Sequence, residues 1–334
     1  MIISRTPFRV SLFGGGSDYP TWFRQHGGAV LGFSINKYCY ISVRELPPFF
    51  EHKHRIVYGR TELVSSLEEI QHPAVRAVLS EMGVRKGLEM HHDGDLPARS
   101  GLGSSSSFTV GLLNALHAAK GEMVSKKALA DQAIHIEQNV IEENVGSQDQ
   151  VWAAYGGLNR IDFHRDNSFD VTPLILSPER RAEFRDSILF FFTGFSRIAS
   201  LVAGEKIKNM EHRQSHLMRI MSMVGDAVEV LRDQNKPIRL LGEMLHESWM
   251  LKRELADQVS NPAIDEIYQN ARDAGAIGGK LLGAGGGGFM VFIVEKHNRE
   301  RVRERLRKLI GANIDIDMSG SKIVVYEPQG LEYC

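Results

Sequence analysis

The chain combines short apolar runs with the two-residue period of a strand and longer runs with the period of a helix. The first clear strand, 8–13, alternates apolar and polar positions and leads into three consecutive glycines. Further strands are predicted at 29–35, 37–43, 54–58, 88–92, 157–163, 169–176, 188–192, 289–294 and 322–326. Helices are predicted at 73–82, 104–119, 125–143, 262–274 and 297–310, and across the Met-rich stretch 197–255, where Pro237 separates two helices.

Strands and helices follow one another without a regular strand–helix–strand alternation, which predicts an α+β fold rather than a doubly wound parallel sheet. The 334 residues are 43% hydrophobic and are enough for two cores. The character of the chain changes at Ser187, because 188–192 is a continuous apolar run typical of a strand buried on both faces. We therefore predict two domains, residues 1–185 and 186–334.

Composition narrows the range of partners. The formal net charge is −1, so the overall charge gives no support for binding to nucleic acid or to an anionic membrane surface. The sequence has no apolar stretch of membrane-spanning length and no signal-peptide pattern. Cys39 and Cys334 do not make a disulfide framework, which favours a reducing cytoplasm. Any anion must therefore be bound by a local site.

The most informative stretch is 96–107, where two glycines and four serines precede a predicted helix. Gly101 and Gly103 can adopt positive φ and let a ligand approach the backbone. The serines that follow are Ser104, Ser105, Ser106 and Ser107. A helix N-terminus offers N–H groups and the positive end of the helix dipole, so this loop suits phosphate oxygens, and a nucleotide is the expected ligand. The alternative is a serine-glycine linker. No lysine follows Gly103, which excludes an ordinary P-loop.

Two carboxylates follow this helix along the chain. The neighbours of Glu137 three and four positions away are all apolar, so its side chain projects from an apolar stripe and needs a partner. A Mg²⁺ ion bridging ATP phosphates would supply one, and a salt bridge to Arg or Lys is the alternative. Asp149 comes just after Gly146, where the predicted helix ends. It is a candidate base for a hydroxyl proton in phosphoryl transfer, or an ordinary cap or turn residue.

Five separated motifs together resemble the GHMP kinases, the family of galactokinase, homoserine kinase, mevalonate kinase and phosphomevalonate kinase. They are the 7–10 segment, the glycine loop 14–18, the serine loop from Pro97, the segment 146–150 and the glycine-rich run 280–288, in that order. The resemblance spans residues 7–294. It implies an N-terminal domain like domain 2 of ribosomal protein S5 and a ferredoxin-like C-terminal domain, with ATP and Mg²⁺ as cofactors.

The same resemblance assigns roles to individual residues. Asp149 matches the catalytic base, Arg9 the cation beside it, and Ser104 and Glu137 the Mg²⁺ ligands. Positions matching the phosphate loop are Pro97, Gly101, Leu102, Gly103, Ser104, Ser105, Ser106 and Ser107. The expected substrate-binding residues are Asp18, which matches the sugar-binding aspartate of galactokinase, with Gly15, Gly16, Ser17, Gly285 and Gly286. Because Gly15 and Gly16 replace the Glu-His of galactokinase, its hydroxyl contacts are not implied.

The loop 14–20 and the segment 193–197 are similar to the branch that holds D-glycero-D-manno-heptose 7-phosphate kinase and fucokinase. The expected reaction moves the γ-phosphoryl of ATP to the anomeric hydroxyl of a sugar or sugar phosphate, with heptose 7-phosphate favoured and fucose as the alternative acceptor. A sugar and ATP sensor without catalysis is the alternative from another class. Arg197 is the candidate for binding the 7-phosphate, and a surface or structural ion pair is its alternative role. The protein is expected to be a monomer or homodimer.

Overall fold

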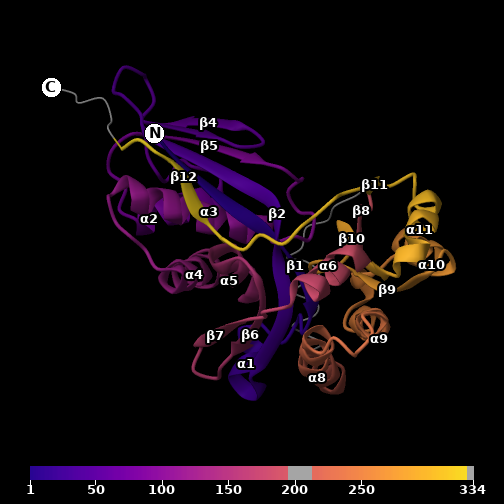
Figure 1. The fold of residues 1–334 in the computed structure, drawn as a ribbon. Coiled ribbons are helices and arrows are strands. Elements are labelled where there is room, and N and C mark those ends of the chain that lie inside the picture. The colour runs from indigo at the N-terminus through magenta and orange to yellow at the C-terminus, as the bar shows by residue number, and fades with distance from the viewer. Residues whose placement is uncertain (195–212, 329–334) are drawn as a thin grey trace.

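The computed structural model describes residues 1–194 and 213–328 of the chain. Two sheets form its framework (Figure 1). The first has eight strands: β1 (Ile2–Phe13), β2 (Gly28–Glu45), β3 (His54–Val57), β4 (Thr61–Val64), β5 (Leu88–Gly94), β6 (Leu158–Phe163), β7 (Phe169–Pro173) and β12 (Lys322–Tyr326). The second has four: β8 (Ile188–Phe192), β9 (Ala276–Leu281), β10 (Phe289–Val294) and β11 (Ile310–Gly311). The predicted α+β fold is confirmed.

The first sheet has the order β12-β1-β2-β5-β3-β4, and β6 pairs with β2 and β7. All of its pairings are antiparallel except that of β3 with β5. Helix α3 (Ser104–Ala119) lies across β1 and β2, with α2 (Pro73–Glu81), α4 (Lys126–His135) and α5 (Gln148–Tyr155) on the same side (Figure 1). The apolar residues of these elements form the larger core.

The second sheet has the antiparallel order β11-β8-β10-β9. Helix α9 (Arg239–Arg253) contacts β9 and β10, α8 (Gln214–Arg232) packs beside α9, and α10 (Pro262–Asp273) contacts β9. The remaining helices are α1 (Pro20–His26), α6 (Pro178–Ser187) and α11 (Arg299–Arg305). The Pro237 break is confirmed, because α8 and α9 lie on either side of it.

Several local features differ from the expectations. The strands predicted at 29–35 and 37–43 form one strand, β2, whose pairing with β1 shifts register between Pro7 and Phe8. The helix predicted at 125–143 changes after His135 into a π-helical turn, Ile136–Val140. Residues 148–155 form a helix, because burial of Val151 and Trp152 against the first sheet stabilises it.

The end of the chain returns to the first sheet. After β11 the backbone N–H of Asp317 donates to Ser34 O, and β12 then pairs with β1. Figure 1 shows this segment, in yellow, running back over the helices and strands of the first sheet. A single boundary at 185/186 therefore does not separate the two sheets, since the last strand belongs with the first.

Candidate active site

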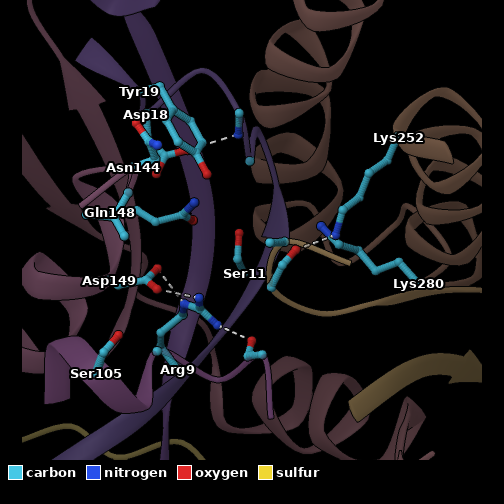
Figure 2. A pocket seen from close by; sticks show the side chains of 18 of the residues that line it. Arg9, Ser11, Asp18, Tyr19, Ser105, Asn144, Gln148, Asp149, Lys252 and Lys280 are labelled. Carbon is cyan, nitrogen blue, oxygen red and sulfur yellow. Dashed lines mark hydrogen bonds and ion pairs between the residues drawn. The ribbon is translucent and has the colours of Figure 1, made fainter. Parts of the chain in front are cut away.

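An ion pair lies in a cleft between the two sheets (Figure 2). Arg9 on β1 donates from Nε to Asp149 Oδ1 at 2.7 Å and from Nη2 to Oδ2 at 2.5 Å. Its Nη1 donates to Gly101 O at 2.6 Å, so the guanidinium also joins the pair to the serine loop. The Arg9 side chain is 6% exposed and that of Asp149 is 24% exposed. Asp149 is thus held from the buried side while its carboxylate stays open to the cleft.

The serine loop brings four of its eight predicted phosphate-binding residues to this cleft. Gly101, Gly103, Ser104 and Ser105 line it. Gly103 is the N-cap of α3 with φ 74°, and it offers no side chain to cap the helix N–H groups, which leaves them suited to an anion. Because a Cβ on Gly103 would lie 3.3 Å from Asp149 Oδ2, the glycine also leaves room for the ion pair.

Of the other four residues of the loop, three have structural contacts. Leu102 is buried, and its carbonyl oxygen accepts a hydrogen bond from the backbone N–H of Arg9 at 3.0 Å. Ser107 donates to Pro7 O at 2.8 Å, and Ser106 donates to Glu137 Oε2 at 2.8 Å. Pro97 is not among the residues that line the cleft. The Ser106 and Ser107 side chains therefore point into the protein and not into the cleft.

The glycine-rich run between β9 and β10 packs closely against the backbone of the serine loop. A Cβ on Gly101 would lie 2.6 Å from Leu282 O, and one on Gly283 would lie 2.5 Å from Gly101 Cα. A Cβ on Gly288 would lie 2.3 Å from Ser100 O, which accepts the backbone N–H of Phe289 at 3.0 Å. We call this contact between residues 100–101 and 282–288 the glycine interlock. It sets the position of the serine loop.

Gly285 and Gly286 were predicted to bind substrate, but the structure places them against Val259. Gly286 donates its N–H to Val259 O at 3.1 Å, and a Cβ on Gly285 would lie 2.7 Å from Val259 Cα. Their neighbours Gly283 and Ala284 line the cleft instead. Arg197 lies outside the described residues.

Glu137 lies in the π-helical turn and is fully buried. Its Oε2 accepts from Ser106 and from Gln150 Nε2 at 2.5 Å, and within the described part of the chain its Oε1 has no hydrogen-bond partner. No ion pair with an Arg or Lys among the described residues balances it. Burial raises the pKa of this carboxyl to about 8, against the hydrogen bonds that favour its ionised form.

These features fit a divalent cation. The donor set is all oxygen, as Mg²⁺ requires, and the orphaned Oε1 is a buried acceptor whose charge a cation would balance. Ser104 lines the cleft, whereas Glu137 reaches α3 through Ser106. The described residues contain no cluster of three or more His, Cys, Asp or Glu side chains suited to a metal. A metal here would therefore share its ligands with phosphate oxygens and water.

The loop after β1 carries a second buried carboxylate. Asp18 is 1% exposed and accepts from the Gly16 N–H at 2.9 Å. Burial raises its pKa, and the nearby Asp149 charge acts in the same direction. Asp18, Gly15 and Gly16 line the cleft, but the Ser17 hydroxyl contacts Gly14 O and Ala29 O and so supports the fold.

The helix that carries Glu137 was expected to end near Gly146, but the chain already turns at Glu142, which has a positive φ of 59°. The reason for a glycine at 146 is space, because a Cβ there would lie 1.8 Å from Asp18 Oδ2. The Gly146 segment thus joins the start of α5, which carries Asp149, to the loop after β1: the backbone N–H of Ser147 donates to Asp18 O at 2.9 Å.

Sequence reasoning missed several residues that line the cleft. They are Ser11, Tyr19, Asn144, Gln148, Lys252 and Lys280. Lys252, in the last turn of α9, donates to Leu281 O at 2.8 Å and Gly283 O at 2.7 Å, and Lys280 on β9 donates to Leu12 O at 2.8 Å. In Figure 2 both lysines lie across the cleft from Asp149. The only sequence signal was the position of Lys280 at the start of the glycine-rich run.

Two family models match the chain: the GHMP kinases N-terminal domain at residues 68–157 and the GHMP kinases C-terminal domain at residues 227–311. The first covers the serine loop, Glu137 and Asp149, and the second covers the glycine-rich run. The chain belongs to the GHMP kinase family. It is therefore a phosphotransferase with an alcohol as acceptor, and the family implies ATP as its phosphoryl donor.

Among its relatives is the D-glycero-alpha-D-manno-heptose 7-phosphate kinase of Campylobacter jejuni, 27% identical over 320 residues, which are 92% of this chain and 93% of the relative. The L-fucokinase/L-fucose-1-P guanylyltransferase of Bacteroides fragilis is 26% identical over 94% of this chain but only 36% of its own length. A D-glycero-D-manno-heptose 1-phosphate kinase structure from Bacteroides thetaiotaomicron has a TM-score of 0.78 with 22% identity, covering 98% of this chain and 100% of that one.

The structure also bears on membrane association. Within residues 1–194 and 213–328, none of the helices of this GHMP kinase combines the length and apolar character needed to cross a bilayer.

Proposed function

We propose that this GHMP kinase transfers the γ-phosphoryl group of ATP to the anomeric hydroxyl of D-glycero-D-manno-heptose 7-phosphate, giving the 1,7-bisphosphate. The observation that supports the chemistry is the Asp149 carboxylate, which Arg9 holds in a bidentate pair beside the N-terminus of α3. The heptose acceptor is supported by the similarity to the Campylobacter jejuni kinase over 92% of the chain.

In the proposed reaction, Asp149 accepts the proton of the anomeric hydroxyl as its oxygen bonds to the γ-phosphorus. The bond from that phosphorus to the β–γ bridging oxygen breaks, and ADP leaves with the electron pair. The N–H groups at the start of α3 and the Ser104 and Ser105 hydroxyls hold phosphate oxygens. Arg9 keeps the base in position, so the enzyme contributes mainly orientation and charge stabilisation.

The proposal includes a Mg²⁺ ion held by Ser104 and Glu137. When bound, this ion would neutralise negative charge on the ATP phosphates. The glycine interlock supports Gly101 behind the same phosphates, and its donors and acceptors are all backbone groups.

The phosphate of the acceptor needs a cationic surface apart from the base. Lys252 and Lys280 are 8% and 4% exposed, and both line the cleft on the side opposite Asp149 (Figure 2). Two buried ammonium groups there favour a second anionic group at that wall. We assign them to phosphate binding, and this assignment extends the site beyond the expectation for Arg197.

A panel of acceptors tests the proposal. The purified protein is assayed for ADP release with ATP, Mg²⁺ and heptose 7-phosphate, heptose, fucose, galactose or mevalonate. We expect kcat/KM for heptose 7-phosphate to exceed that for every other acceptor by 10-fold or more, on the order expected for one lost charged contact. A preference for fucose would support the fucokinase alternative, and ATP binding without turnover of any acceptor would support the sensor.

The proposal retains two further expectations. The enzyme acts in the cytoplasm, and it is a monomer or a homodimer, with a sugar phosphate as its partner and no nucleic acid or membrane. Sedimentation of the purified protein measures the oligomeric state.

A further inference from the structure

Two polar atoms in the cleft wall have no part in the proposed transfer. Ser11 is 6% exposed and Gln148 is 9% exposed. Within the described part of the chain, neither Ser11 Oγ nor Gln148 Oε1 has a hydrogen-bond partner. A buried polar atom without a hydrogen-bond partner destabilises the protein, so its presence beside a cleft points to a ligand that supplies the missing hydrogen bond.

The Gln148 side-chain amide and Ser11 Oγ border one space. A Cβ on Gly15 would lie 3.5 Å from Ser11 Oγ and 3.8 Å from Gln148 Nε2, so the glycine keeps this part of the cleft open. Gln148 directly precedes Asp149 in the first turn of α5. Figure 2 shows the Gln148 amide reaching toward Ser11 across the space next to Asp149.

The orientation of the amide determines what can bind there. The Gln148 side chain forms a hydrogen bond that favours ionised Asp18, which assigns its NH₂ group to that carboxylate. Its Oε1 is then left as an acceptor next to the catalytic carboxylate. An acceptor in this place requires a ligand with a hydroxyl donor.

We propose that Gln148 Oε1, with Ser11 Oγ, binds the C2 hydroxyl of the acceptor sugar. This inference rests on the proposed function, because it places the anomeric hydroxyl at Asp149. The anomeric carbon has two ring neighbours: the ring oxygen, which only accepts hydrogen bonds, and C2, whose hydroxyl donates. Only the C2 hydroxyl satisfies Gln148 Oε1, and Ser11 can donate to the same oxygen. Gln148 is thereby a specificity-determining residue.

The test compares heptose 7-phosphate with its 2-deoxy analogue at saturating ATP. For the unmodified enzyme we expect kcat/KM to be about 10-fold or more lower with the analogue, because the two buried atoms stay unpaired. In Gln148→Leu we expect the two sugars to differ by less than about 3-fold, with KM for ATP unchanged. Gln269→Leu, which alters a surface glutamine on α10 bonded to Asp273, is the matched control and should keep the full preference.

Ser11→Ala is the second variant, and it should also reduce the preference should Gln148→Leu fail to fold. Equal losses for both sugars in these variants, or an unmodified enzyme that does not distinguish them, would overturn the inference. If the unmodified enzyme uses fucose instead, the heptose assignment fails, and 2-deoxyfucose then serves as the analogue in the same comparison. Failure to phosphorylate any sugar would overturn both proposals.

Discussion

Replacement of Gly101 by alanine would test the glycine interlock. Gly101 has φ 82°, and a left-handed backbone costs an alanine about 1–2 kcal/mol. The new Cβ would also lie 2.6 Å from Leu282 O and 2.9 Å from Leu282 C, both backbone atoms that a side-chain rotation cannot move. Such overpacking costs roughly 1–3 kcal/mol. We therefore expect Gly101→Ala to destabilise the protein by about 2–5 kcal/mol in urea unfolding.

Gly121→Ala is the matched control for this experiment. Gly121 has φ 72°, but a Cβ there would meet nothing within 4 Å, so only the backbone cost of about 1–2 kcal/mol applies. Because the displaced loop also carries the groups proposed to bind the ATP phosphates, KM for ATP should rise about 10-fold or more in Gly101→Ala and not in the control. Equal destabilisation of the two variants, with equal KM for ATP, would refute the interlock.

The other predictions concern the proposed transfer. Asp149→Asn should lower kcat on the order of 10²-fold with little change in ATP affinity by calorimetry, and near-normal turnover would exclude Asp149 as the base. Ser104→Ala and Glu137→Gln should raise the Mg²⁺ concentration for half-maximal rate, and unchanged titrations would place the metal elsewhere. Burial raises the pKa of Glu137 to about 8, so folding favours the protonated carboxyl. As the pH rises from about 5 to 8, the metal-free protein should therefore lose stability relative to Glu137→Gln. Urea midpoints of the two proteins that stay parallel across that range would contradict this. Lys280→Met should raise KM for heptose 7-phosphate more than KM for unphosphorylated heptose. Equal changes in the two KM values would contradict a role for Lys280 in binding the phosphate of the acceptor.

Local patterns predicted much of the fold because they report burial. The helix 104–119 is confirmed to the residue, and the strands 188–192, 289–294 and 322–326 are confirmed as well. The patterns could not predict which strands pair with one another. The strand 322–326 would look the same in either sheet, and it pairs with β1 because contacts from Asp317 bring the chain back. Helix α5 was missed because its stability comes from tertiary burial of Trp152 rather than from its own composition.

The residues of the candidate site were likewise predicted only in part. Asp149, Arg9 and Ser104 stand in motifs, and the structure brings them to one cleft. Lys280 begins the glycine-rich motif, but the motif did not predict its place in the cleft, because its ammonium reaches Leu12 O, which is 268 positions away along the chain. Gln148 belongs to no recognisable pattern, and its proposed role rests on a side-chain oxygen without a hydrogen-bond partner. A buried polar atom without a hydrogen-bond partner can be recognised only once the fold is known.

The glycine interlock also has a consequence for the order of events during synthesis. The serine loop leaves the ribosome about 180 residues before the run that supports it, and synthesis at roughly 5–20 residues per second separates the two by about 10–40 s. The first sheet still lacks β12 during that interval. A nascent chain stalled after residue 270 should therefore not retain ATP. Nucleotide binding would instead begin only after residues 282–288 have emerged, which makes it a marker of assembly of the interlock.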